Sequence, residues 1–329
     1  MSGPDVHTFS IDAFIPADFR LASGERLAQA AVRGRLVGPR HAPTIAVVGG
    51  ISSGRAAAVS DDGSPGWWPW AVAQGGPIDL GRVRVLTFDF APEGIDAPLT
   101  ITTHDQAQLL CLLLDTLGIA RLAAFVGCSY GGMVGLALAE AAPARVERLV
   151  IISAAARAHP MAIAQRGIQR RILALAQRAG CEDEGIALAR ELSMTTYRSA
   201  REFAERFDGP APDAVGGMYP VCEYLGKRGR AYPGVMSAAR WASLSDSIDR
   251  HRVDAARIAQ PTTLIAIEED RVVPIEDMRA LAGRLPRCER LVEASSIFGH
   301  DAFLKEPALM GSALADALAP VFAPLAAAA

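Results

Sequence analysis

Val126-Gly127-Cys128-Ser129-Tyr130-Gly131-Gly132 is the stretch of this chain that decides its fold. Apolar residues lead into it and good helix formers follow it, so a serine stands in a turn between a strand and a helix. Gly-x-Ser-x-Gly in this context is typical of a nucleophile elbow. Glycine is needed at Gly127 and Gly131 because a Cβ there would collide with a neighbouring strand or helix. The stretch therefore predicts Ser129 as a nucleophile and the N–H of Tyr130 as an oxyanion donor.

A serine hydroxyl is a weak nucleophile, so a base and an orienting acid are required. Around such an elbow they follow in the order serine, acid, histidine, each just after a later strand. Residues 262–267 are apolar and β-branched and predict such a strand, after which Glu268, Glu269 and Asp270 compete as the acid. We prefer Asp270 because the loop after the strand, and not the last strand residues, faces the site.

The chain has six histidines, and one of them stands where a general base is expected. His300 follows the last predicted strand, residues 290–294, in a loop beside a glycine. His7 and His41 precede the elbow. The remaining three lie in polar or charged sequence where we expect solvent exposure: His104, His159 and His251. His300 is therefore the predicted base.

Length, composition and charge exclude several classes of function. The chain has 329 residues, of which 50% are hydrophobic and 21% charged, so it can form one large α/β domain with an insertion. A formal net charge of −3 gives no basis for binding nucleic acid or an anionic membrane surface. No stretch approaches the roughly 20 apolar residues of a membrane span. We therefore expect no nucleic-acid or membrane partner.

Cysteine usage and the first residues favour a cytoplasmic protein. The five cysteines are odd in number and lack metal-ligand spacing, so we expect reduced thiols and no metal site. Residues 1–5 lack the basic and apolar regions of a signal peptide. Cys128 lies beside the nucleophile, and we interpret it as a small residue that fills the elbow.

The order of predicted elements indicates an α/β-hydrolase fold. Residues 7–13 and 30–37 alternate in polarity and predict an antiparallel start to the sheet. Buried strands are then predicted at residues 44–49, 82–90 and 148–153, with helical runs between them. This alternation predicts a mostly parallel central sheet with helices on both faces.

The alternation stops between residues 154 and 260. Residues 161–179 and 184–192 have helical periodicity, while residues 208–220 are rich in glycine and proline. We predict a helical lid insertion over residues 154–260, and a core formed by residues 1–153 and 261–329.

A second oxyanion donor is predicted after the first central strand. Gly49-Gly50-Ile51 follows that strand, where α/β-hydrolases place such a donor. The N–H of Ile51 would join that of Tyr130 around the developing oxyanion. The alternative is a tight turn that only connects strand to loop.

Several segments resemble one family of this fold, the homoserine O-acyltransferases. Tyr197-Arg198-Ser199 and Gly299-His300-Asp301-Ala302-Phe303 are far more specific to that family than the elbow. The resemblance runs from about residue 36 to residue 305. It is carried by residues 66–68, 77–79, 127–133, 195–199, 206–207, 223–225 and 299–304.

The resemblance implies a reaction and a role for each matching residue. A serine–histidine–aspartate triad takes an acyl group from acyl-CoA by a ping-pong mechanism and passes it to the hydroxyl of L-homoserine. Ser129, Asp270 and His300 would be the triad, Arg198 would hold the homoserine carboxylate and Asp301 its ammonium. Charge-assisted hydrogen bonds suit the recognition of a free amino acid. The alternatives are a lid-surface salt bridge for Arg198 and a helix N-cap for Asp301.

The resemblance also implies a cellular role and an assembly. Acyl-CoA would be a co-substrate, and we expect no bound cofactor. The family works in methionine biosynthesis, and its members are homodimers that associate through the lid helices. The apolar face of residues 161–179 permits such an association.

Departures from the family leave the substrates open. The segment after residue 90 is much shorter than in typical members, and the loop that carries Ile51 differs, so L-serine is an alternative acceptor. Members that use succinyl-CoA tend to carry an arginine two residues after the acid. Val272 stands there and favours acetyl-CoA over succinyl-CoA, although Arg271 is adjacent.

Two other classes of protein would use the same fold. A serine esterase or thioesterase needs the triad but neither Arg198 nor Asp301. A non-catalytic binding protein needs no nucleophile, so an intact set of serine, aspartate and histidine disfavours it.

Overall fold

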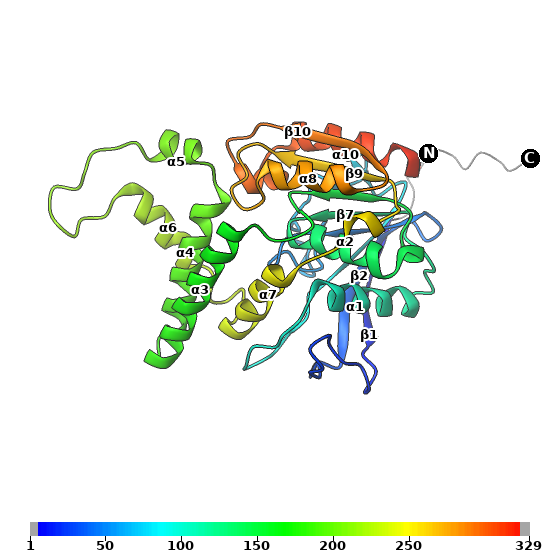
Figure 1. The fold of residues 1–329 in the computed structure, drawn as a ribbon, viewed down its shortest axis with the longest axis horizontal. Helices are drawn as coiled ribbons and strands as arrows, with labels where there is room; N and C mark the ends of the chain where they lie inside the picture. Colours follow the sequence, from blue (N-terminus) through cyan, green and yellow to red (C-terminus); the bar gives the residue numbers. More distant parts are fainter. Residues whose placement is uncertain (1–5, 323–329) are drawn as a thin grey trace, which may run out of the picture.

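The computed structural model describes residues 6–322 and shows a central sheet with helices around it (Figure 1). The outermost parts of the predicted core, residues 1–5 and 323–329, lie outside this description, and with them the expectation about a signal peptide. Within the described residues the main sheet has eight strands in the order β1-β2-β6-β3-β7-β8-β9-β10.

The strand bounds agree with the predicted pattern of an antiparallel start and a parallel continuation. β1 pairs with β2, and β2 with β6, in antiparallel fashion, whereas the other neighbours are parallel. The strands are β1 (His7–Phe14), β2 (Ala31–Gly38), β3 (Thr44–Val48), β6 (Arg84–Phe88), β7 (Ala124–Cys128), β8 (Leu149–Ile152), β9 (Thr262–Ile267) and β10 (Cys288–Ala294). The antiparallel start and the mostly parallel sheet are therefore confirmed. The short strands β4 (Val72–Ala73) and β5 (Ile78–Asp79), which were not predicted, pair with each other.

Helices cover both faces of the sheet because its strands are apolar on both sides. In β3, Ala46 and Val48 pack into one core, while Ile45 and Val47 pack into the other. The first core is covered by α1 (Thr103–Thr116), α2 (Tyr130–Ala141) and α8 (Ile275–Arg284). The second is covered by α10 (Pro307–Phe322) and by the loop that carries the buried Trp68.

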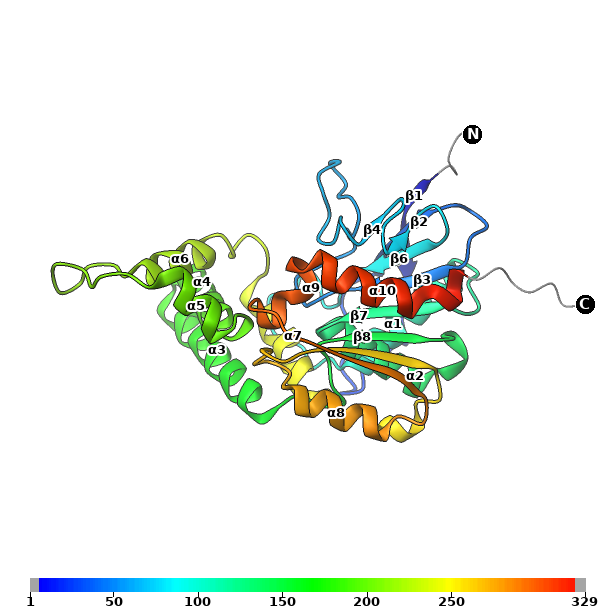
Figure 2. The same ribbon diagram turned by 90° about the horizontal axis from the view of Figure 1, so that it is seen from above.

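Five α-helices are inserted between β8 and β9, within residues 154–260, where the sequence predicts a helical lid. They are α3 (Pro160–Ala179), α4 (Glu182–Tyr197), α5 (Ala200–Phe207), α6 (Pro220–Arg230) and α7 (Ala238–Arg250). Both views show α3, α4 and α6 extending to one side of the sheet, with α7 between them and the core (Figures 1 and 2). Asp249 of α7 ties α3 in place, because its carboxylate lies 2.6 Å from Arg166 Nε and 2.7 Å from Arg170 Nη2.

The prediction that His251 lies in solvent is wrong. The residue follows the last turn of α7, is 2% exposed, and its Nδ1 lies 2.8 Å from the hydroxyl of Thr103 at the start of α1. Burial lowers the pKa of His251 to about 3, so the ring is neutral at physiological pH. Its charged neighbours form ion pairs of their own, Asp249 with Arg166 and Arg250 with Asp246, so the charged sequence does not indicate exposure of the ring.

Within residues 6–322, no helix combines the length and the apolar character that crossing a bilayer requires. Nor do these residues include a cluster of three or more histidine, cysteine, aspartate or glutamate side chains placed to hold a metal ion.

Candidate active site

The elbow has the strained geometry that its glycines make possible. Ser129 has φ 53° and ψ −121°, a conformation that residues other than glycine rarely adopt. A Cβ at Gly131 would lie 2.2 Å from the carbonyl oxygen of Val48, and one at Gly127 would lie 2.6 Å from that of Gly131. Both glycines are therefore required by close backbone approach, and the turn presents the Ser129 hydroxyl at the carboxyl edge of the sheet.

The structure brings Ser129, His300 and Asp270 into one hydrogen-bonded chain. His300 Nε2 lies 2.8 Å from Ser129 Oγ, and His300 Nδ1 lies 2.7 Å from Asp270 Oδ2. The other carboxylate oxygen of Asp270 accepts the N–H groups of Val272 and Val273, each at 2.9 Å. The acid is thus fixed by its own loop and in turn fixes the imidazole, which is the arrangement a serine nucleophile needs.

The two competing acids lie elsewhere. Glu268 is exposed, and the Glu269 carboxylate accepts the N–H of Ser296 at 2.7 Å, which holds it against the loop before His300. Neither carboxylate is hydrogen-bonded to the histidine, whereas Asp270 is buried beside it.

The electrostatics of His300 suit a general base. Burial of the ring by itself lowers its pKa, but the charge of Asp270 and the hydrogen bond to it raise the pKa by more, so the net shift is upward. Such a ring accepts the proton of Ser129 more readily than an isolated histidine does.

Two backbone amides are available for an oxyanion beside Ser129. Within the described residues, neither the Ile51 N–H nor the Tyr130 N–H donates a hydrogen bond. Both residues line the cavity that contains Ser129 and His300. The Tyr130 N–H is also the first of α2, where helix geometry leaves it without an internal partner.

A cavity lies between the carboxyl edge of the sheet and the lid. From the lid, α4 contributes Arg190 and Tyr197, which are seven residues apart and therefore share one face of the helix. The ring of Tyr197 stacks on that of His300 with centroids 5.7 Å apart. The Arg190 guanidinium lies 4.6 Å from the ring centroid of Tyr232, and no described carboxylate forms a salt bridge with it. Sequence reasoning missed Arg190, although its spacing from Tyr197 is a signal that could have found it.

Arg198 lies behind Asp301, with its guanidinium held between two carboxylates. It is 4% exposed and does not line the cavity. Its Nη1 lies 3.3 Å from Glu202 Oε2, and its Nη2 lies 3.2 Å from Asp301 Oδ2. The position of Arg198 therefore does not support direct contact with a substrate. α4 ends at Tyr197 and Arg198 has an extended backbone conformation, so the helical spacing that places Arg190 and Tyr197 at the cavity does not continue to it.

Asp301, in contrast, does line the cavity and adjoins His300. Its Oδ2 pairs with Arg198, while no hydrogen bond within residues 6–322 engages its Oδ1. It is also the residue before α9 (Ala302–Lys305), but its side chain makes no capping hydrogen bond. One carboxylate oxygen is thus held by Arg198, and the other has no hydrogen-bond partner among the described residues.

Of the two residues expected to choose the acyl donor, one lines the cavity and the other does not. Val272 lines the cavity. Arg271 is exposed, does not line the cavity, and its Nη1 lies 3.5 Å from the carbonyl oxygen of Thr195. Another arginine, Arg157, lines the cavity from the segment before α3.

Cys128 fills space in the elbow. Its side chain is fully buried, and burial raises the pKa of the thiol well above its usual range, which suppresses the reactive thiolate. This environment agrees with a packing role beside the nucleophile.

Comparison with known proteins assigns the family. The model of the alpha/beta hydrolase fold family matches residues 75–307. A homoserine O-succinyltransferase from Xanthomonas campestris pv. campestris is 44% identical over 87% of this chain and 78% of its own length. The chain belongs to the homoserine O-acyltransferase family. The predicted α/β-hydrolase fold and the resemblance are both confirmed.

Solved structures show that the fold of this family is shared by proteins with different names. A homoserine O-acetyltransferase from Bacillus anthracis has a TM-score of 0.83 at 17% identity and covers 95% of this chain and 97% of its own. Esterase E22 has the same TM-score and identity and covers 95% of this chain and 100% of its own. Since these likenesses show the fold alone, the residues of the cavity must decide between transfer and hydrolysis.

Proposed function

We propose that the protein is an acyl-CoA:L-homoserine O-acyltransferase that works through an acyl-Ser129 intermediate. The observation that carries this proposal is the presence of opposite charges in the cavity of the triad. Arg190 supplies a cation and Asp301 an anion, and a free amino acid presents one charge of each sign. An esterase or thioesterase needs neither group.

The proposed reaction has two halves. His300 takes the proton of Ser129 as Oγ attacks the thioester carbon, and the N–H groups of Ile51 and Tyr130 bind the oxyanion. The carbon–sulfur bond then breaks, and CoA leaves with the proton held by His300. L-Homoserine enters, His300 takes the proton of its hydroxyl, and that oxygen attacks the acyl carbon. Collapse restores Ser129 and releases the O-acyl ester.

Recognition of the acceptor is assigned to the cavity residues. We propose that Arg190 binds the carboxylate of L-homoserine and that Asp301 binds its ammonium, with Arg198 holding Asp301 in place. This replaces the direct role for Arg198 that the resemblance implies. Positioning the acceptor hydroxyl near His300 would favour transfer over attack by water, which is present in great excess. L-Serine, one methylene shorter, is the alternative acceptor.

The two possible donors are each supported by one observation. Val272 presents a neutral surface to the cavity, which favours acetyl-CoA. The relative that is 44% identical carries the name of a succinyltransferase, and Arg157 offers a cation for the free carboxylate of a succinyl group. We retain acetyl-CoA as the residue-based proposal and make the donor an outcome of the experiment.

The outer face of α3 supports a homodimer through the lid helices. Met161, Ile168 and Leu175 recur every seven residues and are all exposed, so they form one apolar stripe. The proposed role in methionine biosynthesis and the cytoplasmic location follow from the proposed substrates, and five free thiols agree with a reducing compartment.

The first experiment measures CoA release from acetyl-CoA and from succinyl-CoA, each with L-homoserine, with L-serine or with no acceptor. We expect release that depends on L-homoserine and disappears in Ser129→Ala. The thioester that gives the faster L-homoserine-dependent release of CoA is the donor. Release that is equal with and without an amino acid would instead establish a thioesterase.

A further inference from the structure

The loop that carries the Ile51 amide is anchored to the elbow at its beginning. The carbonyl oxygen of Gly49 accepts the N–H of Gly131 at 2.9 Å, and Ser53 closes a turn by donating its N–H to Gly50 at 3.0 Å. A Cβ at Gly49 would lie 2.3 Å from Ser53 Oγ, so the turn is tight. Its other end has to be fixed separately for Ile51 to keep its place.

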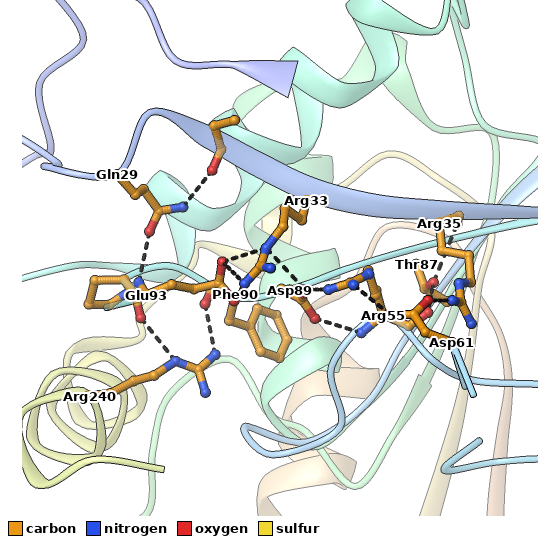
Figure 3. A network of polar contacts seen from close by, with 12 residues as sticks. Gln29, Arg33, Arg35, Arg55, Asp61, Thr87, Asp89, Phe90, Glu93 and Arg240 are labelled. Carbon is orange, nitrogen blue, oxygen red and sulfur yellow. Dashed lines mark hydrogen bonds and ion pairs between the residues drawn. The ribbon is translucent and has the colours of Figure 1, made fainter. Parts of the chain in front are cut away.

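That other end is held by two side chains from β6 and the residue after it (Figure 3). Asp89 Oδ1 accepts the N–H of Arg55 at 2.8 Å, and Asp89 Oδ2 pairs with the Arg55 guanidinium. The hydroxyl of Thr87 donates to the carbonyl oxygen of Arg55. Both backbone groups of Arg55 are thus bound to the sheet, four residues beyond Ile51. Gly54, with φ +61°, lets the chain pass directly over the Asp89 carboxylate.

Charged neighbours extend this anchor across the edge of the sheet (Figure 3). Arg55 Nη2 lies 2.8 Å from Asp61, and Asp61 also pairs with Arg35 of β2. Asp89 and Arg35 are both buried. If one member of a buried ionic group moves away, its partner is left as an uncompensated buried charge, which is costly. Such a group therefore favours a single arrangement of the segments that carry it.

The chain that carries Asp89 is itself fixed from the lid side. Arg240 of α7 donates to the carbonyl oxygens of Phe90 and Pro92, each at 2.9 Å. The side chain of Gln106 in α1 accepts the N–H of Ala91 at 3.1 Å. The segment after Asp89 is therefore held by α7 and α1, through contacts that do not involve the loop of Ile51.

We propose that Asp89 and Arg55 are positioning residues for the oxyanion site, because together they hold the loop that presents the Ile51 amide to Ser129. Neither residue lines the cavity, so they act through Ile51. Oxyanion stabilisation depends on donors that are in place before the reaction. The inference rests on the proposed function only in assigning that role to Ile51.

The test measures acylation of Ser129 by p-nitrophenyl acetate, which requires the triad and the oxyanion site but no CoA and no acceptor. The amplitude of the nitrophenol burst counts active molecules, and its rate constant reports acylation. We expect Asp89→Ala to lower this rate constant by about 100-fold, the effect of a displacement near 1 Å. The burst amplitude and the ester concentration for half-maximal rate should stay close to wild type. Asp89→Asn keeps an acceptor for the Arg55 N–H and should give an intermediate rate.

Glu93→Gln is the matched control. Glu93 belongs to the same charged network, where it contacts Arg33 at 2.9 Å, but it makes no contact with the loop. We expect its acylation rate to equal wild type. A trifluoromethyl ketone, which forms a tetrahedral oxyanion on Ser129, should lose affinity in Asp89→Ala in parallel with the acylation rate, which a general loss of stability would not produce.

The outcomes separate this inference from the proposed function. A wild-type acylation rate in Asp89→Ala, or an equal loss in Glu93→Gln, would overturn the inference alone. A slowed burst in Asp89→Ala, together with wild-type CoA release that ignores amino acids, would support the inference and overturn the transferase. Absence of a burst dependent on Ser129 in the wild-type protein would overturn both.

Discussion

At the residue scale, His300 sets the pH range in which Ser129 can be activated. Only the neutral imidazole accepts a proton, and Asp270 raises the pKa of this ring in spite of its burial. Activity should therefore fall as the pH is lowered through a midpoint above about 6.5, the ordinary value for histidine. Asp270→Asn removes the charge that raises the pKa, so the midpoint should move to lower pH while kcat drops by about 10⁴. The pH profile of kcat/KM measures both, and an unmoved midpoint would contradict the role of Asp270.

Acceptor recognition is a second property of single residues. Arg190→Ala should raise the KM for L-homoserine by about 10- to 100-fold, because a hydrogen bond to a charged group contributes about 1.5–3 kcal/mol. The half-reaction that acylates Ser129 should be unaffected. Arg271→Ala is the control, since Arg271 is an exposed arginine that does not line the cavity. Steady-state kinetics with varied acceptor distinguishes the two, and equal effects of both variants would argue against Arg190.

Sequence patterns were informative about residues at the ends of strands and less so about the lid. Ser129, Asp270 and His300 follow strands whose carboxyl ends meet at one edge, so their order along the chain predicted their meeting. Arg198 is one position beyond the end of α4, so the helical spacing that places Arg190 and Tyr197 on one face does not fix the direction of its side chain. A linear motif contains no information about where the last helical turn stops.

At the scale of elements, the proposed homodimer would use the exposed apolar stripe of α3. Met161, Ile168 and Leu175 are exposed by 60, 49 and 62%, a stripe that a partner helix would cover. Ile168→Glu combined with Leu175→Glu should convert the proposed dimer into a monomer, as light scattering at micromolar concentration would show. Phe14→Glu is the control, because Phe14 is 79% exposed on the edge strand β1, away from α3. A wild-type monomer would refute the dimer.

Predicting elements from the sequence succeeded where periodicity is strong. The predicted helices at residues 161–179 and 184–192 correspond to α3 and α4, although α4 continues to Tyr197. The strands β4 and β5 have two residues each, too few for an alternation to be recognised. Ion pairs between distant segments, such as Arg166 with Asp249, likewise leave no trace in local sequence.

At the scale of the whole molecule, His251 links stability to pH. Its pKa is about 3 in the folded protein, below the ordinary value of 6.5, so only the unfolded chain binds a proton between these values. The free energy of unfolding is therefore highest above pH 6.5, as far as this group is concerned, and it falls progressively as the pH is lowered toward 3. Between pH 7 and 5, this site alone should cost about 2 kcal/mol.

Urea unfolding at pH 7 and pH 5 tests this linkage. His251→Asn preserves a polar partner for Thr103 but does not titrate, so it should lose about 2 kcal/mol less than wild type between the two pH values. The difference between the proteins isolates His251 from all other titrating groups. Identical pH dependence in both proteins would show that the ring remains accessible to protons.

The end of α4 packs against the loop of His300, and this contact, a seam between the lid and the core, limits which residues can be substituted during evolution. A Cβ at Gly299 would lie 3.2 Å from both the Tyr197 carbonyl oxygen and the Ser199 N–H nitrogen, so the segment that ends α4 rests on the loop of His300. Substitutions at residues 197–199 would therefore alter specificity and catalysis at once. Arg190 lies two helical turns away, and its guanidinium reaches the seam at the ring of Tyr197, 5.6 Å from the ring centroid, while its backbone does not take part in the contact with Gly299. New acceptor preferences should accordingly have evolved along the inner face of α4, while its C-terminal end stayed nearly constant.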